Sequence, residues 1–165
     1  MSGKKQKFLL VIPGESKYLE IIREFIAKIA RSVGFNEEHI NKIQVSVDEA
    51  CTNVVKHAYQ GMKKKDVRIE VELDVEKMTI AIIDKGKGFD PKTIEPLNMN
   101  KYLNEFRRGG LGIHLMNILM DEIKYSIHPL KKNQVTMVKY FHREESQEKK
   151  IRQKILMERS YARKK

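Results

Sequence analysis

The chain has 165 residues, of which 41% are hydrophobic, and carries a formal net charge of +11. This length and composition predict a single domain with a hydrophobic core. No apolar run reaches the roughly 18 residues that a membrane span needs, so we expect no membrane partner. The single cysteine, Cys51, excludes an internal disulfide bond and is typical of a cytoplasmic protein. The positive charge favours acidic partners, namely nucleic acid, phosphate compounds or acidic proteins.

The first half of the chain predicts one strand and two helices. Residues 8–12 form an apolar run that is too short for the core of a signal peptide and is typical of a strand. Residues 18–33 carry apolar side chains at helical spacing, and Gly34 ends that helix. Asn36 is typical of a helix N-cap, and a long helix is predicted from there to about Tyr59.

Two strands follow this helix. Residues 67–75 alternate apolar and polar side chains, which indicates a half-buried strand. Residues 78–83 are more apolar, so we expect this strand to lie nearer the centre of the sheet. The short link at Glu76 and Lys77 predicts that the two strands form an antiparallel hairpin.

The remainder predicts a loop, a helix, two strands and a tail. Residues 91–108 have little periodicity and the length that is typical of a functional lid. The sequence GGLGIHLMNILMDEI predicts a glycine turn that opens a helix, and strands are predicted near residues 125–128 and 134–141. We expect a folded domain over residues 1–143 and a basic helical tail over residues 144–165. The layout predicts an α+β fold, a two-layer sandwich of a mixed, mostly antiparallel sheet with helices on one face.

A polar stripe lies along the second predicted helix, in the sequence DEACTNVVKHAY. With Glu49 at zero on a helical wheel, Asn53 falls at roughly 40° and His57 at roughly 80°, beside the apolar face. Asparagine is a mediocre helix former, so its amide oxygen suggests a ligand such as Mg²⁺, which prefers hard oxygen atoms. Glu49, one turn earlier, could act as a general base. Alternatively, Glu49 and Asn53 form an ordinary intrahelical pair and His57 is a core or capping residue.

Two glycine-rich turns are further candidates for a binding site. The sequence DKGKGFD places Asp84 at the end of a central strand, where its carboxylate could accept a hydrogen bond from an exocyclic amine such as that of adenine. The sequence RRGGLG opens a helix whose N-terminal amides could bind a phosphate. Each turn is also compatible with a purely structural role, as an Asx turn or a simple helix start. The second turn matches neither a Walker P-loop nor a dinucleotide-binding fingerprint.

The order of these three segments resembles the ATP-binding superfamily of gyrase, the heat-shock chaperone, histidine kinases and mismatch-repair ATPases. DEACTNVVKHAY resembles its N box, DKGKGFD its first glycine box and RRGGLGIHLM its second. The residues of the boxes and the compact size of the chain are most similar to those of the anti-sigma factor serine kinases, and the similarity covers roughly residues 8–142. The resemblance implies a Bergerat-type ATP-binding fold, and residues 1–143 would then be an ATP-binding, kinase-like domain.

The resemblance also implies roles for individual residues. Asn53 would be the Mg²⁺ ligand, and Glu49 the general base that acts on an attacking hydroxyl. Asp84 would read the adenine, in a pocket shaped by Gly86 and Gly88. The remaining residues of the boxes that would contact the nucleotide are Thr52, His57, Arg108, Gly110, Leu111 and Gly112.

The implied activity is ATP- and Mg²⁺-dependent phosphorylation of a serine on a STAS-type anti-sigma factor antagonist. The implied partners are that antagonist and a sigma factor that the protein sequesters, and a homodimer is expected. An ATP-binding regulator without significant kinase activity is the alternative. A histidine-kinase catalytic domain is disfavoured because few residues precede the core. Direct nucleic-acid binding is disfavoured because no known module is present and aromatic residues are few.

Overall fold

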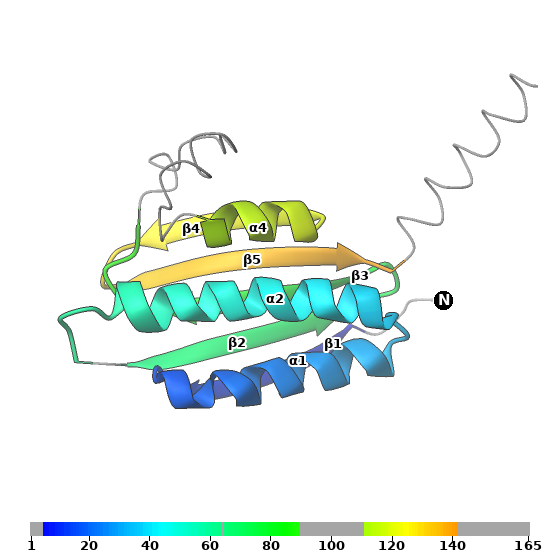
Figure 1. The fold of residues 1–165 in the computed structure, drawn as a ribbon, viewed down its shortest axis with the longest axis horizontal. Coiled ribbons are helices and arrows are strands. Elements are labelled where there is room, and N and C mark those ends of the chain that lie inside the picture. The colour runs from blue at the N-terminus through cyan, green and yellow to red at the C-terminus, as the bar shows by residue number, and fades with distance from the viewer. Residues whose placement is uncertain (1–4, 64, 90–110, 142–165) are drawn as a thin grey trace, which may run out of the picture.

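The computed structural model describes residues 5–63, 65–89 and 111–141, which form an α+β sandwich of one sheet and one layer of helices (Figure 1). The sheet has the order β1-β2-β3-β5-β4, and all four pairings are antiparallel. The strands are β1 (Gln6–Pro13), β2 (Asp66–Leu73), β3 (Lys77–Asp84), β4 (Glu122–His128) and β5 (Lys132–Tyr140). The helices are η1 (Ser16–Tyr18), α1 (Leu19–Ser32), α2 (Glu37–Asn53), η2 (Val54–Ala58) and α4 (Leu111–Leu119).

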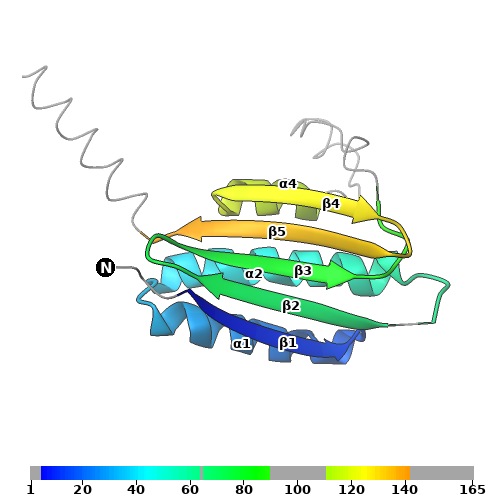
Figure 2. The same cartoon turned by 180° about the vertical axis from the view of Figure 1, so that it is seen from behind.

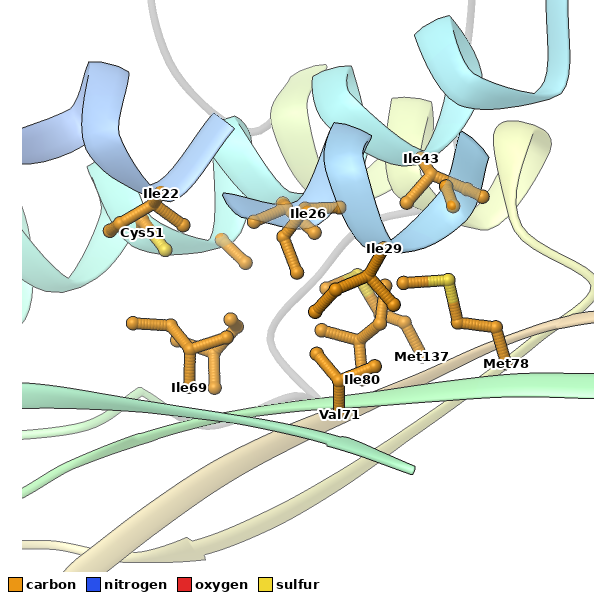
Figure 3. Close-up of a cluster of buried hydrophobic side chains, with 14 of the residues drawn as sticks. Ile22, Ile26, Ile29, Ile43, Cys51, Ile69, Val71, Met78, Ile80 and Met137 are labelled. Atoms are coloured by element: carbon orange, nitrogen blue, oxygen red, sulfur yellow. The ribbon is translucent and has the colours of Figure 1, made fainter. Parts of the chain in front are cut away.

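The helices α1, α2 and α4 cover one face of the sheet, and the view from behind shows the uncovered face (Figure 2). This confirms the predicted fold class, and β3 is central as expected. Alternate strand residues point to the helices, so the pairs Ile69–Ile82 and Ile80–Met137 lie in register on the inner face. Side chains from the two layers fill the space between them (Figure 3). This core fixes the helices over the sheet and so positions the polar residues of α2.

The turn between β2 and β3 differs from the prediction. Val75 is not part of β2, because the strand ends at Leu73 and Val75 is 70% exposed. Lys77 begins β3 rather than linking the strands. The reason is Asp74, whose Oδ1 accepts hydrogen bonds from the amides of Glu76 and Lys77 at 2.8 and 3.0 Å. An Asx turn therefore interrupts the alternating pattern before Val75.

The last helix is also shorter than predicted. α4 ends at Leu119, and β4 begins at Glu122 instead of near Tyr125. The buried Lys139 of β5 donates to the carbonyl of Leu119 at 3.0 Å, and Asp121 accepts the Tyr140 amide at 2.8 Å. The first contact gives a carbonyl at the helix C-terminus a hydrogen-bond partner, and the second holds the link between α4 and β4 against β5.

The predicted second helix changes geometry before its end. α2 is α-helical only to Asn53, and residues Val54–Ala58 form a π-turn, in which the Tyr59 amide donates to the Val54 carbonyl at 3.1 Å. The carbonyl of Ala58 accepts a hydrogen bond from the Lys87 amide at 2.9 Å. The wider turn therefore packs against the segment that follows β3. A π-turn of this kind is frequent near functional sites.

The N-cap of α2 confirms the prediction for Asn36, whose Oδ1 accepts the His39 amide at 2.8 Å. We expect Asn36→Ala to lower the free energy of unfolding by about 1 kcal/mol, because the amide loses its partner at the helix N-terminus. Chemical denaturation measures this loss, and Asn36→Asp, which keeps an acceptor, should retain the stability of the parent. Equal losses in both variants would contradict the capping role.

No helix in the described ranges combines the length and apolar character that crossing a membrane requires.

Candidate nucleotide-binding site

A cavity of about 330 Å³ lies between the helices and the inner face of the sheet. Its lining includes residues at the end of the sheet where β3 stops and where β4 turns into β5, namely Asp84, Ile127 and Asn133. Most of its lining is apolar, with polar groups from α2, β3 and β5. The lining residues are Ala50, Asn53, Val54, His57, Ala58, Ile82, Asp84, Gly88, Phe89, Gly112, Ile113, Met116, Tyr125, Ile127, Asn133, Gln134 and Val135. Its size and mixed lining are those of a small-molecule site.

Asp84 is the buried carboxylate of this cavity, with only 6% of its surface exposed. It follows Met78, Ile80 and Ile82 on the inner face of β3, so the strand carries it beneath the helices. Its Oδ1 accepts hydrogen bonds from the Gly86 amide at 2.7 Å and from Asn133 Nδ2 at 2.9 Å. Within the described residues its second oxygen, Oδ2, accepts none, so it is available to a ligand donor.

Asn133 of β5 is a site residue that the sequence prediction missed. It lies directly opposite Asp84 in the β3–β5 register and is 2% exposed. Its Nδ2 donates both to Asp84 and to the carbonyl of Gly86, the latter at 3.0 Å. No motif marks it, but it has the same strand phase as the partly buried Val135 and the buried Met137, so the alternation of the strand predicts that it points inward.

The two glycines after β3 shape the site in different ways. A side chain on Gly86 would meet the backbone of Ala58, with a Cβ only 2.5 Å from the carbonyl oxygen, and Gly86 itself does not line the cavity. Its role is to let β3 pack against the π-turn. Gly88 does line the cavity and has a φ of +68°, which favours glycine, and a Cβ there would lie 2.8 Å from Asn133 Oδ1.

The polar stripe predicted along the second helix runs from α2 into η2 and reaches the cavity in part. Asn53 and His57 line it, whereas Thr52 and Glu49 do not. The Glu49 carboxylate lies beside Gly112 in the first turn of α4, where a Cβ on the glycine would overlap Oε2. Leu111, the first residue of α4, is 37% exposed and does not line the cavity. The structure thus brings together Asn53, His57, Asp84, Gly88 and Gly112.

Other predicted features lie outside the described residues. These are Arg108, Gly110, the segment 91–108 that is predicted to be a lid, and the predicted tail 144–165. Within the described residues no group of three or more His, Cys, Asp or Glu side chains is arranged to hold a metal ion. Cys51 is buried in the core, as predicted, and burial raises the pKa of its thiol.

Among the described residues, two buried polar atoms of this lining find no hydrogen-bond partner, Asn133 Oδ1 and the Tyr125 hydroxyl. Burial raises the pKa of Tyr125, whose ring packs edge-on against Phe89 with centroids 5.5 Å apart. Buried polar groups are normally paired in folded proteins, so unpaired groups around a cavity suggest a ligand or a water molecule.

The contact of Glu49 with Gly112 leads to a testable expectation. In Gly112→Ala the new methyl group must displace the flexible end of Glu49, which is inexpensive for the fold because α4 gains a better helix former. If Glu49 acts on a substrate, its displacement should lower the turnover number about 100-fold, the scale expected for a misplaced catalytic group. Phosphotransfer assays and thermal unfolding measure the two effects separately. Asn117→Ala, on the exposed side of α4, is the control, and unchanged turnover in Gly112→Ala would oppose a role for Glu49.

The site is thus a mainly apolar cavity that is lined by the buried Asp84 carboxylate and by the polar side chains of Asn53, His57 and Asn133. The family model described as a histidine kinase-like ATPase domain matches residues 12–139. The serine-protein kinase RsbW of Bacillus licheniformis is 32% identical over 136 residues, covering 80% of this chain and 84% of that protein. RsbW of Bacillus cereus is 34% identical over 149 residues, covering 88% and 91%.

A solved structure agrees in fold. The crystal structure of the RsbU and RsbW domains of a Mycobacterium tuberculosis protein matches with a TM-score of 0.58 at 14% identity. The match covers 81% of this chain and 32% of that longer chain.

The fold and the cavity define an ATPase domain of the histidine kinase-like type. The chain belongs to this family and, within it, to the serine-protein kinases named RsbW. The resemblance drawn from the three sequence boxes is confirmed, as is the predicted class of enzyme, a protein-serine kinase.

Proposed function

We propose that the cavity binds ATP with Mg²⁺ and that the protein transfers the γ-phosphoryl group to a serine of a STAS-type antagonist. We further propose that it sequesters a sigma factor, acts as a homodimer and works in the cytoplasm. The observation that carries the nucleotide proposal is Asp84, a buried carboxylate with one oxygen held by the protein and one left for a ligand. An adenine amine supplies the donor that this oxygen lacks.

The residues of α2 suit the phosphate end of such a ligand. Asn53 lines the cavity and offers an amide oxygen, and Mg²⁺ binds few protein oxygens when it also binds phosphates and water. Asn53 would hold the ion, which neutralises phosphate charge when bound. Gly112 lines the cavity in the first turn of α4, and the backbone amides of that helix N-terminus would bind the phosphates.

Glu49 is placed one helical turn before Asn53 and is proposed as the general base. In the transfer, the serine oxygen forms a bond to the γ-phosphorus while the bond from that phosphorus to the bridging oxygen breaks, releasing ADP. The serine proton passes to the Glu49 carboxylate. Phosphoryl transfer depends mainly on positioning and charge stabilisation, so the base orients the hydroxyl more than it activates it.

Asn53→Ala tests the metal–nucleotide proposal. We expect Mg²⁺ to tighten ATP binding to the parent protein and to have little effect on the variant, because the amide oxygen is lost. Calorimetric titration with ATP, with Mg²⁺ and with chelator, measures this difference. Asn117→Ala should behave like the parent. Absence of ATP binding to the parent would refute the nucleotide proposal itself, and an undiminished Mg²⁺ effect in Asn53→Ala would refute only the ligand assignment.

A regulator that binds ATP but transfers no phosphate is the second candidate. It is favoured by one observation, that Glu49 contacts Gly112 and does not line the cavity. The two candidates differ in an assay with labelled ATP and a STAS-domain antagonist that carries the acceptor serine. Serine labelling supports the kinase, whereas sigma-factor capture without labelling supports the regulator.

A further inference from the structure

Exposed lysines gather at the end of the sheet where β2 begins, β3 ends and β4 turns into β5, and both views place these three points on one side of the molecule (Figures 1 and 2). They come from residues 56–65, 85–89 and 128–132, of which the first segment holds four lysines and each of the others two. None of the three segments contains an aspartate or a glutamate. We call this surface the basic end and define it by its described, exposed lysines, which are Lys56, Lys63, Lys65, Lys85, Lys87, Lys131 and Lys132.

Backbone hydrogen bonds join the three segments into one surface. The Lys87 amide donates to the carbonyl of Ala58 at 2.9 Å, and the Leu130 amide donates to the carbonyl of Gly86 at 2.8 Å. A Cβ on Gly61 would lie 3.7 Å from Lys87 Nζ, so the Lys87 side chain reaches the turn that follows η2. The lysines of the basic end are therefore neighbours in space although they are far apart in sequence.

The charge of the basic end is not neutralised within the described part of the chain. None of its lysines belongs to an ion pair among the described residues. None of them lines the cavity either, so nucleotide phosphates in the cavity do not account for them. Like charges that lie close together repel one another and oppose folding. A cluster of this kind without counter-charges suits an anionic partner.

Leu130 lies within this surface and has an unusual backbone conformation. It is the third residue of a turn that the Lys131 amide closes by donating to the His128 carbonyl at 3.0 Å. Pro129 at the second position and a φ of +63° at Leu130 are typical of a type II turn, which favours glycine or asparagine at the third position. The leucine found there is 58% exposed. A strained backbone that presents an apolar side chain to solvent suggests a contact with a partner.

We propose that the basic end, with Leu130 as its apolar anchor, docks an acidic segment of a partner protein that carries apolar side chains. The lysines attract the carboxylates of that segment, and burial of Leu130 adds affinity that exposed charges do not supply. Leu130 favours a protein over a nucleic acid, because a phosphate backbone would use the lysines but offers the leucine no apolar surface. The inference does not depend on the proposal that the cavity binds ATP.

The test measures the affinity of two fluorescent peptides for the full-length protein by anisotropy. In one peptide glutamates flank two leucines, and in the other serines replace the leucines. The parent should bind the leucine peptide more tightly, and added salt should weaken both complexes. Lys85→Glu combined with Lys131→Glu should weaken both at least about tenfold. The matched control, Lys28→Glu with Lys124→Glu, reverses two exposed lysines outside the basic end and should change affinity only about twofold, through net charge.

Leu130→Asn separates the apolar anchor from the charges. It should weaken the leucine peptide about tenfold, because a buried leucine is lost, and leave the serine peptide unchanged. Asparagine adopts a positive φ more readily than leucine, so the melting temperature should not fall. All variants should bind ATP like the parent in calorimetry, since neither Leu130 nor the substituted lysines line the cavity.

Several results would overturn the proposal. These are equal peptide affinities in the two double variants, failure of the parent to bind either peptide, and an unchanged preference for the leucine peptide in Leu130→Asn. Tighter binding of the parent to duplex DNA, or to phosphatidylglycerol vesicles, than to the leucine peptide would also overturn it and assign the surface to nucleic acid or to a lipid surface. Failure of the parent to bind ATP would refute the nucleotide proposal alone.

Discussion

Glu49→Gln should lower the rate of phosphotransfer by about 10² to 10⁴, the usual contribution of a positioned general base. Glutamine has nearly the same shape as glutamate, so its contact with Gly112 and the packing of α2 against α4 should persist. It cannot accept the serine proton. Because Glu49 does not line the cavity, ATP affinity should change little. Single-turnover transfer from labelled ATP to a STAS-domain antagonist measures the rate, and calorimetry measures the affinity.

Asp48→Asn is the matched control for this experiment. Asp48 precedes Glu49 in the same helix, but its carboxylate pairs with Arg23 of α1 at 3.2 Å, outside the cavity. Both members of this pair are partly exposed, so its loss should cost less than about 1 kcal/mol and leave turnover intact. Equal transfer rates in Glu49→Gln and in the parent would remove Glu49 from the mechanism, whereas the absence of transfer by the parent would favour the regulator.

Asp84→Asn should weaken ATP binding by more than about 100-fold, because the free acceptor oxygen is replaced by an amide donor that faces the adenine amine. The oxygen of the new amide can still accept from Gly86 and Asn133, so the variant should fold. Those hydrogen bonds lose the assistance of the negative charge, and we expect a fall of about 1 kcal/mol in the free energy of unfolding. Calorimetry with ATP and thermal unfolding test the two parts.

The control for this variant is Asp66→Asn. Asp66 begins β2 with an exposed side chain, and its backbone carbonyl accepts a hydrogen bond from the Tyr59 hydroxyl at 2.8 Å, which the substitution leaves in place. This variant should bind ATP like the parent. Retention of ATP affinity in Asp84→Asn would mean that the base is recognised elsewhere in the cavity.

The fold was largely predictable because each element has a strong local pattern. The inner-face run of β2 alternates through Val67, Ile69 and Val71, and all three are buried. The errors occurred where a side chain from a distant or neighbouring residue competes with the pattern. Asp74 ends β2 before Val75, and Lys139 of β5 donates a hydrogen bond to the last carbonyl of α4.

Site residues could be predicted where they belong to a sequence motif, and they could not where a single residue has no motif around it. Asn53 and Asp84 were found from the boxes, and both line the cavity. Asn133 was missed because a single asparagine in a strand carries no spacing signal, and its importance arises only from the pairing of β3 with β5. The prediction for Gly86 was incomplete for the same reason, because Gly86 packs against Ala58, which is distant in sequence.

The π-turn at Val54–Ala58 makes the chain sensitive to length at this point, even at positions where composition is free. Lys56 is exposed, so many side chains would be tolerated there. Removing one residue from the turn would instead rotate the Ala58 carbonyl about the helix axis and away from the Lys87 amide, which it binds at 2.9 Å. The number of residues between Asn53 and Ala58 therefore determines whether η2 packs against the segment that follows β3. A one-residue deletion should separate these two walls of the cavity.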